Sequence, residues 1–489
     1  MGVIQKQALR TTIVTFVGIG IGAISRFIMP FFLSKEQIGT LALLESTSLM
    51  LMTIFSLGFP QITLKLFPYF RNEKEGNNGY LMFGIILSLI GVGLGSLTFY
   101  LFQDLILGNA ENTKMIQSFA YLIFPLLFFR TLFKNLDSYL RMLYSSVTGA
   151  FLEAFLLKLV IFLGLFIFWL HLVDFEGLAF IYVTAFCLPG LLIVIASLLK
   201  TKKITFPKQK LFGNQKSNIF KYGSFGVLAS ASGAIIITID QLMLNQRLGT
   251  EAVGVYSIMF FAGILINVPS RGIRRIASTV LAESWKENNL IEIKSIYKKS
   301  ALNQMVIGFY LFIVGWACLE PVVTYLPQYS EGIYVFFFIG LAQLIDMMTG
   351  VNNEIIMTSS KYKLNTYFNV LLAILIIIFN HFFITFWGIV GAAAATTLSM
   401  TIINLLRYLF LKREFKLEPF SKSFFRILII GIVLFTLVSV IKVPLNPIPK
   451  IIFYIILVTL LYWGVIIKLN LSTDINSWLL KIKNKFSKP

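Results

Sequence analysis

Apolar runs long enough to cross a lipid bilayer follow one another along this chain, with only short connections between them. A hydrocarbon core about 30 Å thick needs roughly 20 apolar residues per helix, and the sequence contains about 14 such runs. Mean hydropathy is +0.82 over 489 residues. Because no connection is long enough for a soluble catalytic domain, we predict an all-α integral membrane protein that is not an enzyme.

The positive charge of the chain follows from its predicted topology. The sequence has 42 Lys and Arg against 22 Asp and Glu, a net charge of +20. If the N-terminus is cytoplasmic, most basic residues fall in connections on the cytoplasmic side, as the positive-inside rule requires. We therefore expect a multi-pass protein of the bacterial plasma (inner) membrane with both termini cytoplasmic. Membrane lipids, and not nucleic acid, are the expected partners of these basic segments.

A weak internal repeat divides the predicted helices into two lobes. A shift of about 215 residues sets Leu33 over Leu248, Glu36 over Glu251 and Gly39 over Gly254. Six helices per lobe is an even number, so the lobes form a parallel repeat about a pseudo-two-fold axis. The predicted parts are an N-lobe (1–199), a basic cytoplasmic linker (200–222) whose Phe212 and Phe220 lie among lipid headgroups, a C-lobe (223–411), two further helices (412–468) and a cytoplasmic amphipathic tail (469–489).

Metal, cofactor and nucleophilic chemistry find no support in the sequence. His171 and His381 stand apart, with no Cys, Asp or Glu at ligand spacing. Cys187 and Cys318 lie in apolar helices and are read as small core residues. Four prolines, in contrast, predict interruptions in helices: Pro60, Pro125, Pro189 and Pro269.

Charged residues inside apolar helices are costly in lipid, which makes them the candidate functional residues. Arg26 follows Gly18 and Gly22 at four-residue steps, so one side of the first helix presents two glycines, open space and a guanidinium. Glu45 on the second helix lies at a similar distance from their shared hairpin, so the two can pair. A paired arginine in a wet cavity keeps donors for phosphate, so pairing and substrate binding both stay open.

A second basic group lies at the end of the eighth predicted helix. Arg271, Arg274 and Arg275 project from one side of it, a geometry that suits a multiply charged anion. The alternative is contact with lipid headgroups. Lys158, at mid-depth in the fifth helix, completes the candidate cationic cavity.

Other basic residues are assigned to the membrane surface. Lys65, Arg130, Lys134 and Arg141 are placed near predicted helix ends, where long side chains reach lipid headgroups.

Three acidic residues are candidates for a coupling or cavity role: Glu45, Asp240 and Asp346. Asp240 has no basic residue at equal depth on the following helix, and Asp346 stands in a polar stripe with Gln343, Gly350 and Asn353 that indicates a water-facing wall. Either aspartate could bind a coupling proton or sodium ion. The alternative is a hydrogen-bonded interior carboxylate without a coupling role.

The chain resembles the multidrug/oligosaccharidyl-lipid/polysaccharide (MOP) flippase superfamily, in particular the bacterial flippases of O-antigen and capsule units. The resemblance rests on residues 26–39 with 56–60, on 240–256 and on 387–399, and it covers essentially the whole chain. It implies that an undecaprenyl-pyrophosphate-linked oligosaccharide, such as a lipopolysaccharide O-antigen unit, crosses the membrane by alternating access through a cationic cavity. A monomer working beside glycosyltransferases and a polysaccharide polymerase is expected.

In relatives that flip the peptidoglycan precursor lipid II, arginines on helices one and eight line that cavity, and Arg26 and residues 271–275 match them. Glu45 replaces the basic residue expected in helix two, which weakens the assignment to lipid II. Two further alternatives remain: a multidrug exporter or cation antiporter of the same fold, which needs an acidic lumen, and a membrane-embedded polymerase or glycosyltransferase, which needs a large outer loop.

Overall fold

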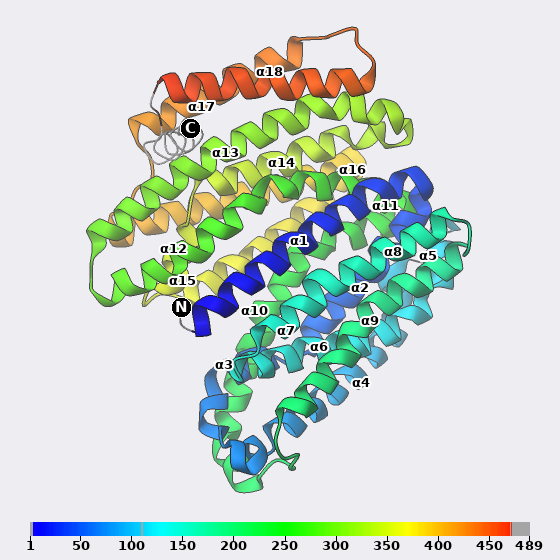
Figure 1. The fold of residues 1–489 in the computed structure, drawn as a ribbon, viewed down its shortest axis with the longest axis vertical. Coiled ribbons are helices and arrows are strands. Elements are labelled where there is room, and N and C mark those ends of the chain that lie inside the picture. Colours follow the sequence, from blue (N-terminus) through cyan, green and yellow to red (C-terminus); the bar gives the residue numbers. More distant parts are fainter. Residues whose placement is uncertain (1–2, 109–110, 470, 472–489) are drawn as a thin grey trace, which may run out of the picture. The chain divides into compact units, whose positions relative to one another are not determined.

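The computed structural model describes residues 3–108, 111–469 and 471, and these form helices and connections without a strand (Figure 1). The chain divides into two compact units, residues 1–258 (unit 1) and 259–489 (unit 2). Unit 1 holds α1 (Val3–Phe32), α2 (Lys35–Phe55), α3 (Phe59–Phe70), η1 (Glu73–Gly79), α4 (Tyr80–Leu107), η2 (Glu111–Thr113), α5 (Lys114–Ser118), η3 (Ala120–Leu122), α6 (Ile123–Met142), α7 (Ser146–Ala150), the π-helix η4 (Phe151–Leu156), α8 (Leu157–Trp169), α9 (Phe175–Lys200) and α10 (Gln209–Leu248). The boundary falls within α11 (Thr250–Ile264). Unit 2 holds η5 (Leu265–Asn267), α12 (Val268–Lys286), α13 (Leu290–Tyr325), η6 (Pro327–Gly332), α14 (Ile333–Met348), α15 (Asn352–Thr358), α16 (Lys363–Phe415), α17 (Lys422–Val440) and α18 (Pro447–Lys468).

The protein is a multi-pass membrane protein. Among the described residues, 12 helices are long and apolar enough to cross a membrane, or up to 13 if a bent pair counts as one span. One of them, α16, has 53 residues and breaks at Gly388 (φ 56°, ψ −133°). A straight helix of that length would measure about 80 Å, far more than a membrane. Counting its two arms, 363–387 and 389–415, as separate crossings would give the predicted 14, a number that stays a prediction.

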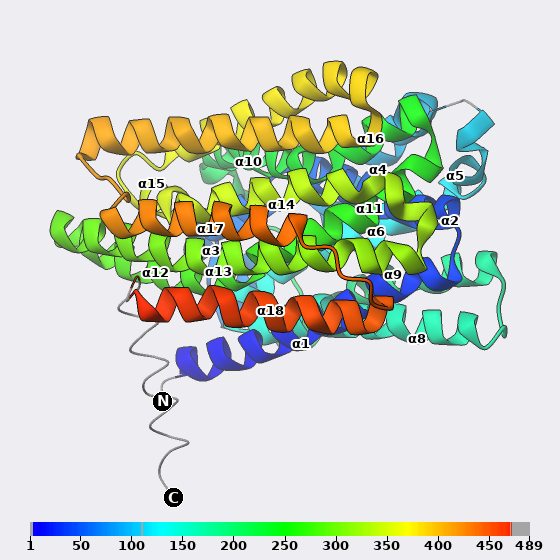
Figure 2. The ribbon, with the colours of Figure 1, turned by 90° about the horizontal axis from the view of Figure 1, so that it is seen from above.

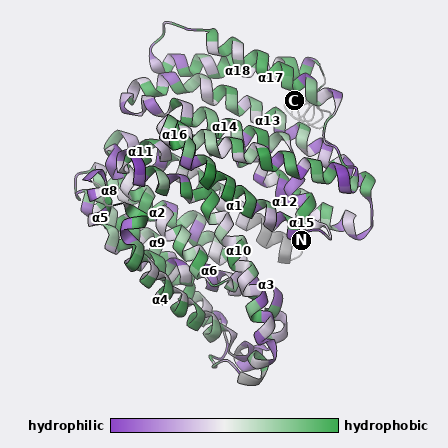
Figure 3. Cartoon of the chain, turned by 180° about the vertical axis from the view of Figure 1, so that it is seen from behind, coloured by the Kyte–Doolittle hydropathy of each residue, from purple (hydrophilic) through white to green (hydrophobic). Residues whose placement is uncertain are grey.

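Hydropathy is distributed along the helices as a membrane protein requires. Figure 3 shows apolar residues running along helices such as α4, while hydrophilic residues gather at helix ends and connections. In α4 only about a quarter of the most apolar window, 28%, is buried inside the protein. The remaining apolar surface of this helix is suited to contact with lipid.

Most of the predicted proline interruptions are present. Pro60 and Pro269 occupy the first turn of α3 and of α12. Pro125 is the third residue of α6, which follows a bend of 44°. Before α3 the chain turns at Gly58, whose φ of 68° favours glycine. Pro189 lies inside α9, which stays one helix, so the predicted interruption is absent there.

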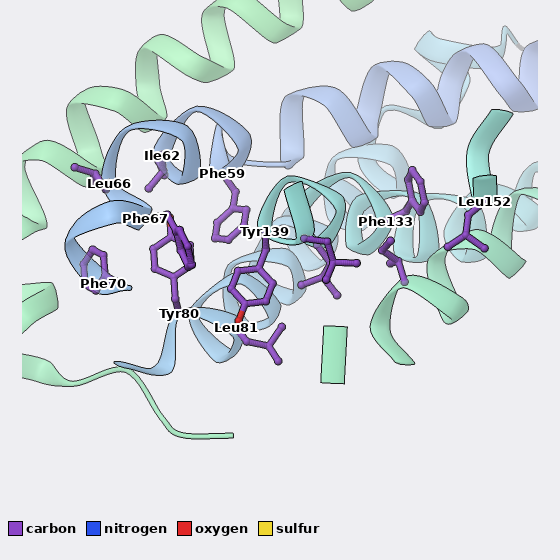
Figure 4. Close-up of a cluster of buried hydrophobic side chains, with 13 residues drawn as sticks. Phe59, Ile62, Leu66, Phe67, Phe70, Tyr80, Leu81, Phe133, Tyr139 and Leu152 are labelled. Carbon is purple, nitrogen blue, oxygen red and sulfur yellow. The ribbon is translucent and has the colours of Figure 1, made fainter. Parts of the chain in front are cut away.

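An aromatic cluster joins the ends of three helices in unit 1 (Figure 4). Phe59, Phe67 and Phe70 of α3 meet Tyr80 at the start of α4 and Tyr139 of α6. The ring of Phe67 lies 5.2 Å from that of Tyr80 and 5.6 Å from that of Tyr139, both edge-on. Edge-on aromatic pairs stabilise a fold by more than the burial of their surface alone, so these contacts stabilise this end of unit 1.

The basic linker packs on the same end of unit 1. Thr205 donates to the carbonyl oxygen of Glu75 at 3.2 Å, and from Gln209 on the linker is part of α10. Phe212 packs on this cluster, with its ring centre 4.4 Å from that of Phe70, and it is partly buried. Its predicted contact with headgroups stays a prediction. Phe220 is 78% exposed, as a headgroup contact would need.

The two copies of the sequence repeat contact one another reciprocally within unit 1. Each begins a helix after a tight turn: Ser34 caps α2, and Thr250 begins α11. A Cβ added at Gly39 would overlap the carbonyl oxygen of Thr250, and a Cβ at Gly254 would overlap that of Lys35. The shift that relates the two glycines also relates Lys35 to Thr250. Such reciprocity is what a two-fold axis requires, although the pseudo-symmetry itself stays a prediction.

In unit 2 the last two helices pack on α13. Figures 1 and 2 show α17 and α18 beside α13. The hydroxyl of Tyr462 donates to the carbonyl oxygen of Val306 at 2.8 Å. Lys450, at the start of α18, binds both carboxylate oxygens of Glu320 at 3.0 Å. The predicted amphipathic tail, apart from residues 469 and 471, lies outside the described residues.

Candidate functional site: buried charges in each unit

The ion pair between Arg26 and Glu45 is present, and it lies at the centre of a half-buried polar group in unit 1. Arg26 of α1 binds Oε2 of Glu45 on α2. The hydroxyl of Tyr182, on α9, donates to the same oxygen at 2.8 Å, and Arg26 approaches that hydroxyl at 3.4 Å. The side chains of Arg26 and Glu45 are 17% and 26% exposed. Three helices thus meet at one carboxylate.

Arg130 adds a second guanidinium to this group. It lies on α6 and donates from Nη1 to the carbonyl oxygen of Glu45 at 2.9 Å and to the hydroxyl of Ser48 at 2.5 Å. Its guanidinium carbon is 4.7 Å from the centre of the Phe186 ring, a cation–π contact. Arg130 is therefore held in one orientation by α2 and α9 and retains further N–H donors.

Lys158 completes the group from α8. Its ammonium lies 5.9 Å from the Phe186 ring centre, and its charge interacts with that of Glu45. The stem of Lys158 covers Gly22, where an added Cβ would lie 3.3 Å from Cδ. One turn earlier, Gly18 is packed so tightly that a Cβ would overlap the carbonyl oxygen of Ala154. The open space predicted beside these glycines is therefore filled, because η4 and α8 pack closely on α1.

The charges that gather around Glu45 in unit 1 do not balance. We call Arg26, Arg130, Lys134, Lys158, Glu45 and Glu153 the basic cluster. Lys134 lies one turn after Arg130 on α6, and Glu153 interacts with the charges of both. Four cations then face two carboxylates. Cations that are partly withdrawn from water without a counter-charge are costly, so this group is suited to receiving an anion.

Sequence reasoning missed Arg130, Lys134 and Tyr182. Arg130 and Lys134 were both placed near the end of a predicted helix, but α6 continues to Met142. Both therefore lie well inside the helix. The signal available was their four-residue spacing, which places them on one side of a helix. Tyr182 carries no charge, and nothing in the sequence singles it out.

Asp240 is also buried in unit 1. It lies on α10 with 2% of its surface exposed, and the hydroxyl of Tyr256 on α11 donates to its Oδ2. The hydrogen-bonded carboxylate that the sequence left open as an alternative is thus observed. This geometry neither requires nor prevents a coupling role.

In unit 2, Arg274 and Asp346 form the corresponding buried ion pair. Nη2 of Arg274, on α12, lies 2.5 Å from Oδ2 of Asp346, on α14. Asn267 donates to the same oxygen at 3.0 Å and to Gln343 at 2.9 Å. Asn404 of α16 approaches Oδ1 at 3.4 Å. Asp346 is 8% exposed, so it belongs to an interior network and not to the predicted water-facing wall.

The predicted polar stripe around Asp346 is interrupted. α14 ends at Met348, and Gly350 has φ 65° in the turn before α15. Gly350 and Asn353 therefore do not continue one helix with Gln343 and Asp346. The spacing of the polar residues did not reveal this turn, because such spacing does not show where a helix ends.

The arginine group on α12 is divided by its surroundings. Arg274 points into unit 2, whereas Arg271 and Arg275 are exposed within that unit. Of the five predicted cationic residues, Arg26 and Lys158 thus meet in unit 1, Arg274 pairs in unit 2, and the other two lie on its surface. Their role as one substrate site stays a prediction.

Metal binding has no candidate residues among those that the structure describes. No group of three or more His, Cys, Asp or Glu in them could hold a metal ion. Glu418, just beyond α16, binds Lys412 at 2.7 Å, and this cation lowers the pKa of the Glu418 carboxyl.

Comparison with known proteins identifies relatives in sequence and in fold. Residues 4–282 match the model of the family described as "Polysaccharide biosynthesis protein". The capsular polysaccharide biosynthesis protein CapF of Staphylococcus aureus is 22% identical over 207 residues, 41% of this chain and 52% of CapF. The chain thus matches about half the length of that curated relative.

Solved structures share the fold over most of the chain. The lipid II flippase MurJ in an inward closed conformation has a TM-score of 0.73 at 16% identity, covering 96% of this chain and 99% of MurJ. An inward-facing multidrug resistance MATE family transporter of the MOP superfamily has a TM-score of 0.65 at 16% identity, covering 84% and 98%. A MOP superfamily transporter from Pyrococcus furiosus, described as having a binding pocket of reverse polarity, has a TM-score of 0.57 at 15% identity, covering 84% of this chain and 96% of that transporter. At these identities the likeness shows a shared fold.

Proposed function

This chain belongs to the polysaccharide biosynthesis protein family, and we propose that it is a flippase for an undecaprenyl-pyrophosphate-linked oligosaccharide, an O-antigen or other surface polysaccharide unit. It would move the headgroup across the bacterial inner membrane by alternating access while the polyprenyl tail stays in lipid. A diphosphate with its sugars cannot cross hydrocarbon unaided, so a polar environment must replace its hydration.

The excess of cations in the basic cluster carries this proposal. Arg26, Arg130 and Lys158 approach from three helices, and Glu45 neutralises only one of them. Guanidinium groups bind phosphate oxygens with several donors at once, and Arg130 is fixed in orientation by Ser48 and Phe186. Buried donors that are already oriented lose little entropy when a diphosphate binds.

The sign of this charge separates the proposal from its alternatives. A multidrug exporter or cation antiporter would have to bring an organic cation past the guanidinium groups of Arg26 and Arg130, which repel it. A lipid II flippase would carry the same diphosphate, so charge does not exclude that function. Glu45, in place of the basic residue that the resemblance leads one to expect, favours a different saccharide unit.

Coupling to a proton or sodium gradient is a secondary proposal, supported by Asp240. Its carboxylate is buried and accepts a hydrogen bond from the hydroxyl of Tyr256. Asp346 is a weaker candidate because Arg274 already neutralises it. Flipping that continues unchanged after both gradients are collapsed would reject the coupling role.

A complementation experiment tests the proposed function. In a strain that lacks this gene, the chain should restore surface glycan, and Arg26→Ala or Arg130→Ala should reduce it at least about tenfold while membrane insertion is kept. Arg413→Ala is the matched control, since Arg413 is exposed at the end of α16. Normal surface glycan in both cluster variants would reject the anion-binding assignment.

A further inference from the structure

A second basic site lies at the far end of α6 in unit 1, apart from the basic cluster. A cavity of about 240 Å³ opens where α3, α6 and α9 end. We call it the basic pocket; its lining includes Arg71, Glu73, Asn77, Tyr144, Lys200 and Lys202. A water molecule occupies roughly 30 Å³ in the liquid, so the pocket has room for a phosphate group with its ester substituent.

Arg71 is fixed at this pocket by contacts on several sides. Its guanidinium carbon lies 5.4 Å from the centre of the Phe67 ring and 5.1 Å from that of Tyr144. Nη2 donates to the carbonyl oxygen of Met142 at 2.5 Å, and Nη1 donates to the Tyr144 hydroxyl at 3.2 Å. A guanidinium has five N–H donors, so three remain for a ligand in a group that is already oriented.

The walls of the pocket are held in place by the aromatic cluster. Phe67, which stacks on Arg71, lies edge-on to Tyr80 and Tyr139 (Figure 4). Tyr144 adopts φ 58°, a conformation that non-glycine residues rarely take. This conformation ends α6, because the amide of Ser145 donates to the carbonyl oxygen of Leu140 at 3.0 Å and that of Tyr144 to the carbonyl oxygen of Arg141 at 3.1 Å.

The charge of the pocket is positive. Lys202 pairs with Glu73 at 3.0 Å, which leaves Arg71 and Lys200 as uncompensated cations. Lys200 has no ion pair with any residue in the described part of the chain. Part of this charge complements the carbonyl ends of α6 and α9, as cations at helix C-termini do. Two positive charges beside a cavity, one of them on the oriented side chain of Arg71, nevertheless exceed what one capped carbonyl oxygen requires.

We propose that the basic pocket binds a phosphate group at the level of the lipid headgroups, on the side of the membrane that the basic connections predict to be cytoplasmic. Arg71 binds the phosphate oxygens with its remaining donors, Lys200 supplies the second charge, and Tyr144 covers the ester substituent. Phosphodiesters of anionic phospholipids lie at this level of the membrane, and free phosphate offers the same oxygens. The site is separate from the transport proposal and does not depend on it.

Lipid binding to the full-length protein tests this site without any transport measurement. The purified protein would be titrated with phosphatidylglycerol or phosphatidylcholine in neutral detergent, and bound lipid counted by native mass spectrometry. We expect phosphatidylglycerol to bind preferentially, and Arg71→Gln with Lys200→Gln to weaken that binding about tenfold. A separate competition experiment adds inorganic phosphate to the lipid-bound protein. If millimolar phosphate displaces the lipid, the pocket also binds the free anion.

Two controls keep the test decisive. Lys286→Gln with Lys294→Gln removes the same charge from exposed positions in unit 2 and should leave lipid binding unchanged. Because Arg71 also caps Met142, Lys200→Gln with Lys202→Gln provides a second variant that leaves this cap intact. Phosphatidylglycerol binding that stays equal to the control in both pocket variants would overturn the proposal.

Discussion

The hydroxyl of Tyr182 donates to Oε2 of Glu45 at 2.8 Å, the same oxygen that Arg26 binds. The carboxylate of Glu45 thus accepts hydrogen bonds from Arg26 and Tyr182, donors that a phosphate oxygen of the proposed substrate would need. We infer that Glu45 holds the basic cluster together in the absence of substrate and competes with an incoming anion. This relationship gives Glu45 a role different from that of its cationic neighbours.

Glu45→Gln should therefore strengthen binding of a polyprenyl diphosphate analogue, by at least about fivefold, because one negative charge near the ligand is removed. Arg26→Ala should weaken the same binding. Calorimetry on the purified protein measures both. Weaker binding by Glu45→Gln would indicate that the carboxylate serves the substrate directly, contrary to this account.

Export should depend on the shape of the side chain at position 130 as well as on its charge. Arg130→Lys keeps the cation but loses the paired contacts to Glu45 and Ser48, whereas Arg130→Met keeps only the apolar stem. We expect surface glycan to fall partly with lysine and almost completely with methionine. Equal export by the two variants would show that orientation and charge at this position do not matter.

The contact between α1 and η4 should depend on the absence of a side chain at Gly18. Gly18→Ala would push a Cβ into the carbonyl oxygen of Ala154 and lower stability by about 1–3 kcal/mol. Gly20→Ala on the same helix is the matched control, since an added Cβ there meets nothing within 4 Å. Thermal unfolding in detergent compares them, and equal midpoints would contradict the packing.

The ion pair of unit 2 should be mainly structural. Asp346→Asn leaves Arg274 buried without its counter-charge, which should cost about 3 kcal/mol. Adding Arg274→Gln should recover part of that loss, because the unpaired charge is removed. Arg271→Gln, exposed on the same helix, serves as the control in the same unfolding measurement. If the double variant is no more stable than Asp346→Asn alone, the unpaired charge of Arg274 is not the cause of the lost stability.

The fold could be predicted from sequence because each crossing helix must be apolar over its own length. Local signals also worked: the glycine and proline near position 60 mark the break between α2 and α3. The site was predicted only in part. Arg26 and Glu45 share one hairpin, so their depths could be compared, whereas Arg130 depends on where α6 ends.

Side-chain direction explains the remaining differences. Arg271, Arg274 and Arg275 share one side of a helix by spacing, yet Asp346 draws only Arg274 inward. Phe212 was predicted to contact headgroups because its neighbours are lysines, but the rings of α3 and α4 also offer it an apolar contact. Both outcomes depend on residues distant in sequence, which a linear pattern does not reveal.

Reconstituted flipping is the most direct measurement of the central claim that the basic cluster carries an anionic headgroup. Proteoliposomes would contain a fluorescent polyprenyl-diphosphate oligosaccharide, with a fluorescent organic cation in a parallel assay. The account predicts flipping of the diphosphate lipid, its loss with Arg26→Ala or Arg130→Ala, and no transport of the cation. Transport of the cation, or flipping that survives both substitutions, would contradict it.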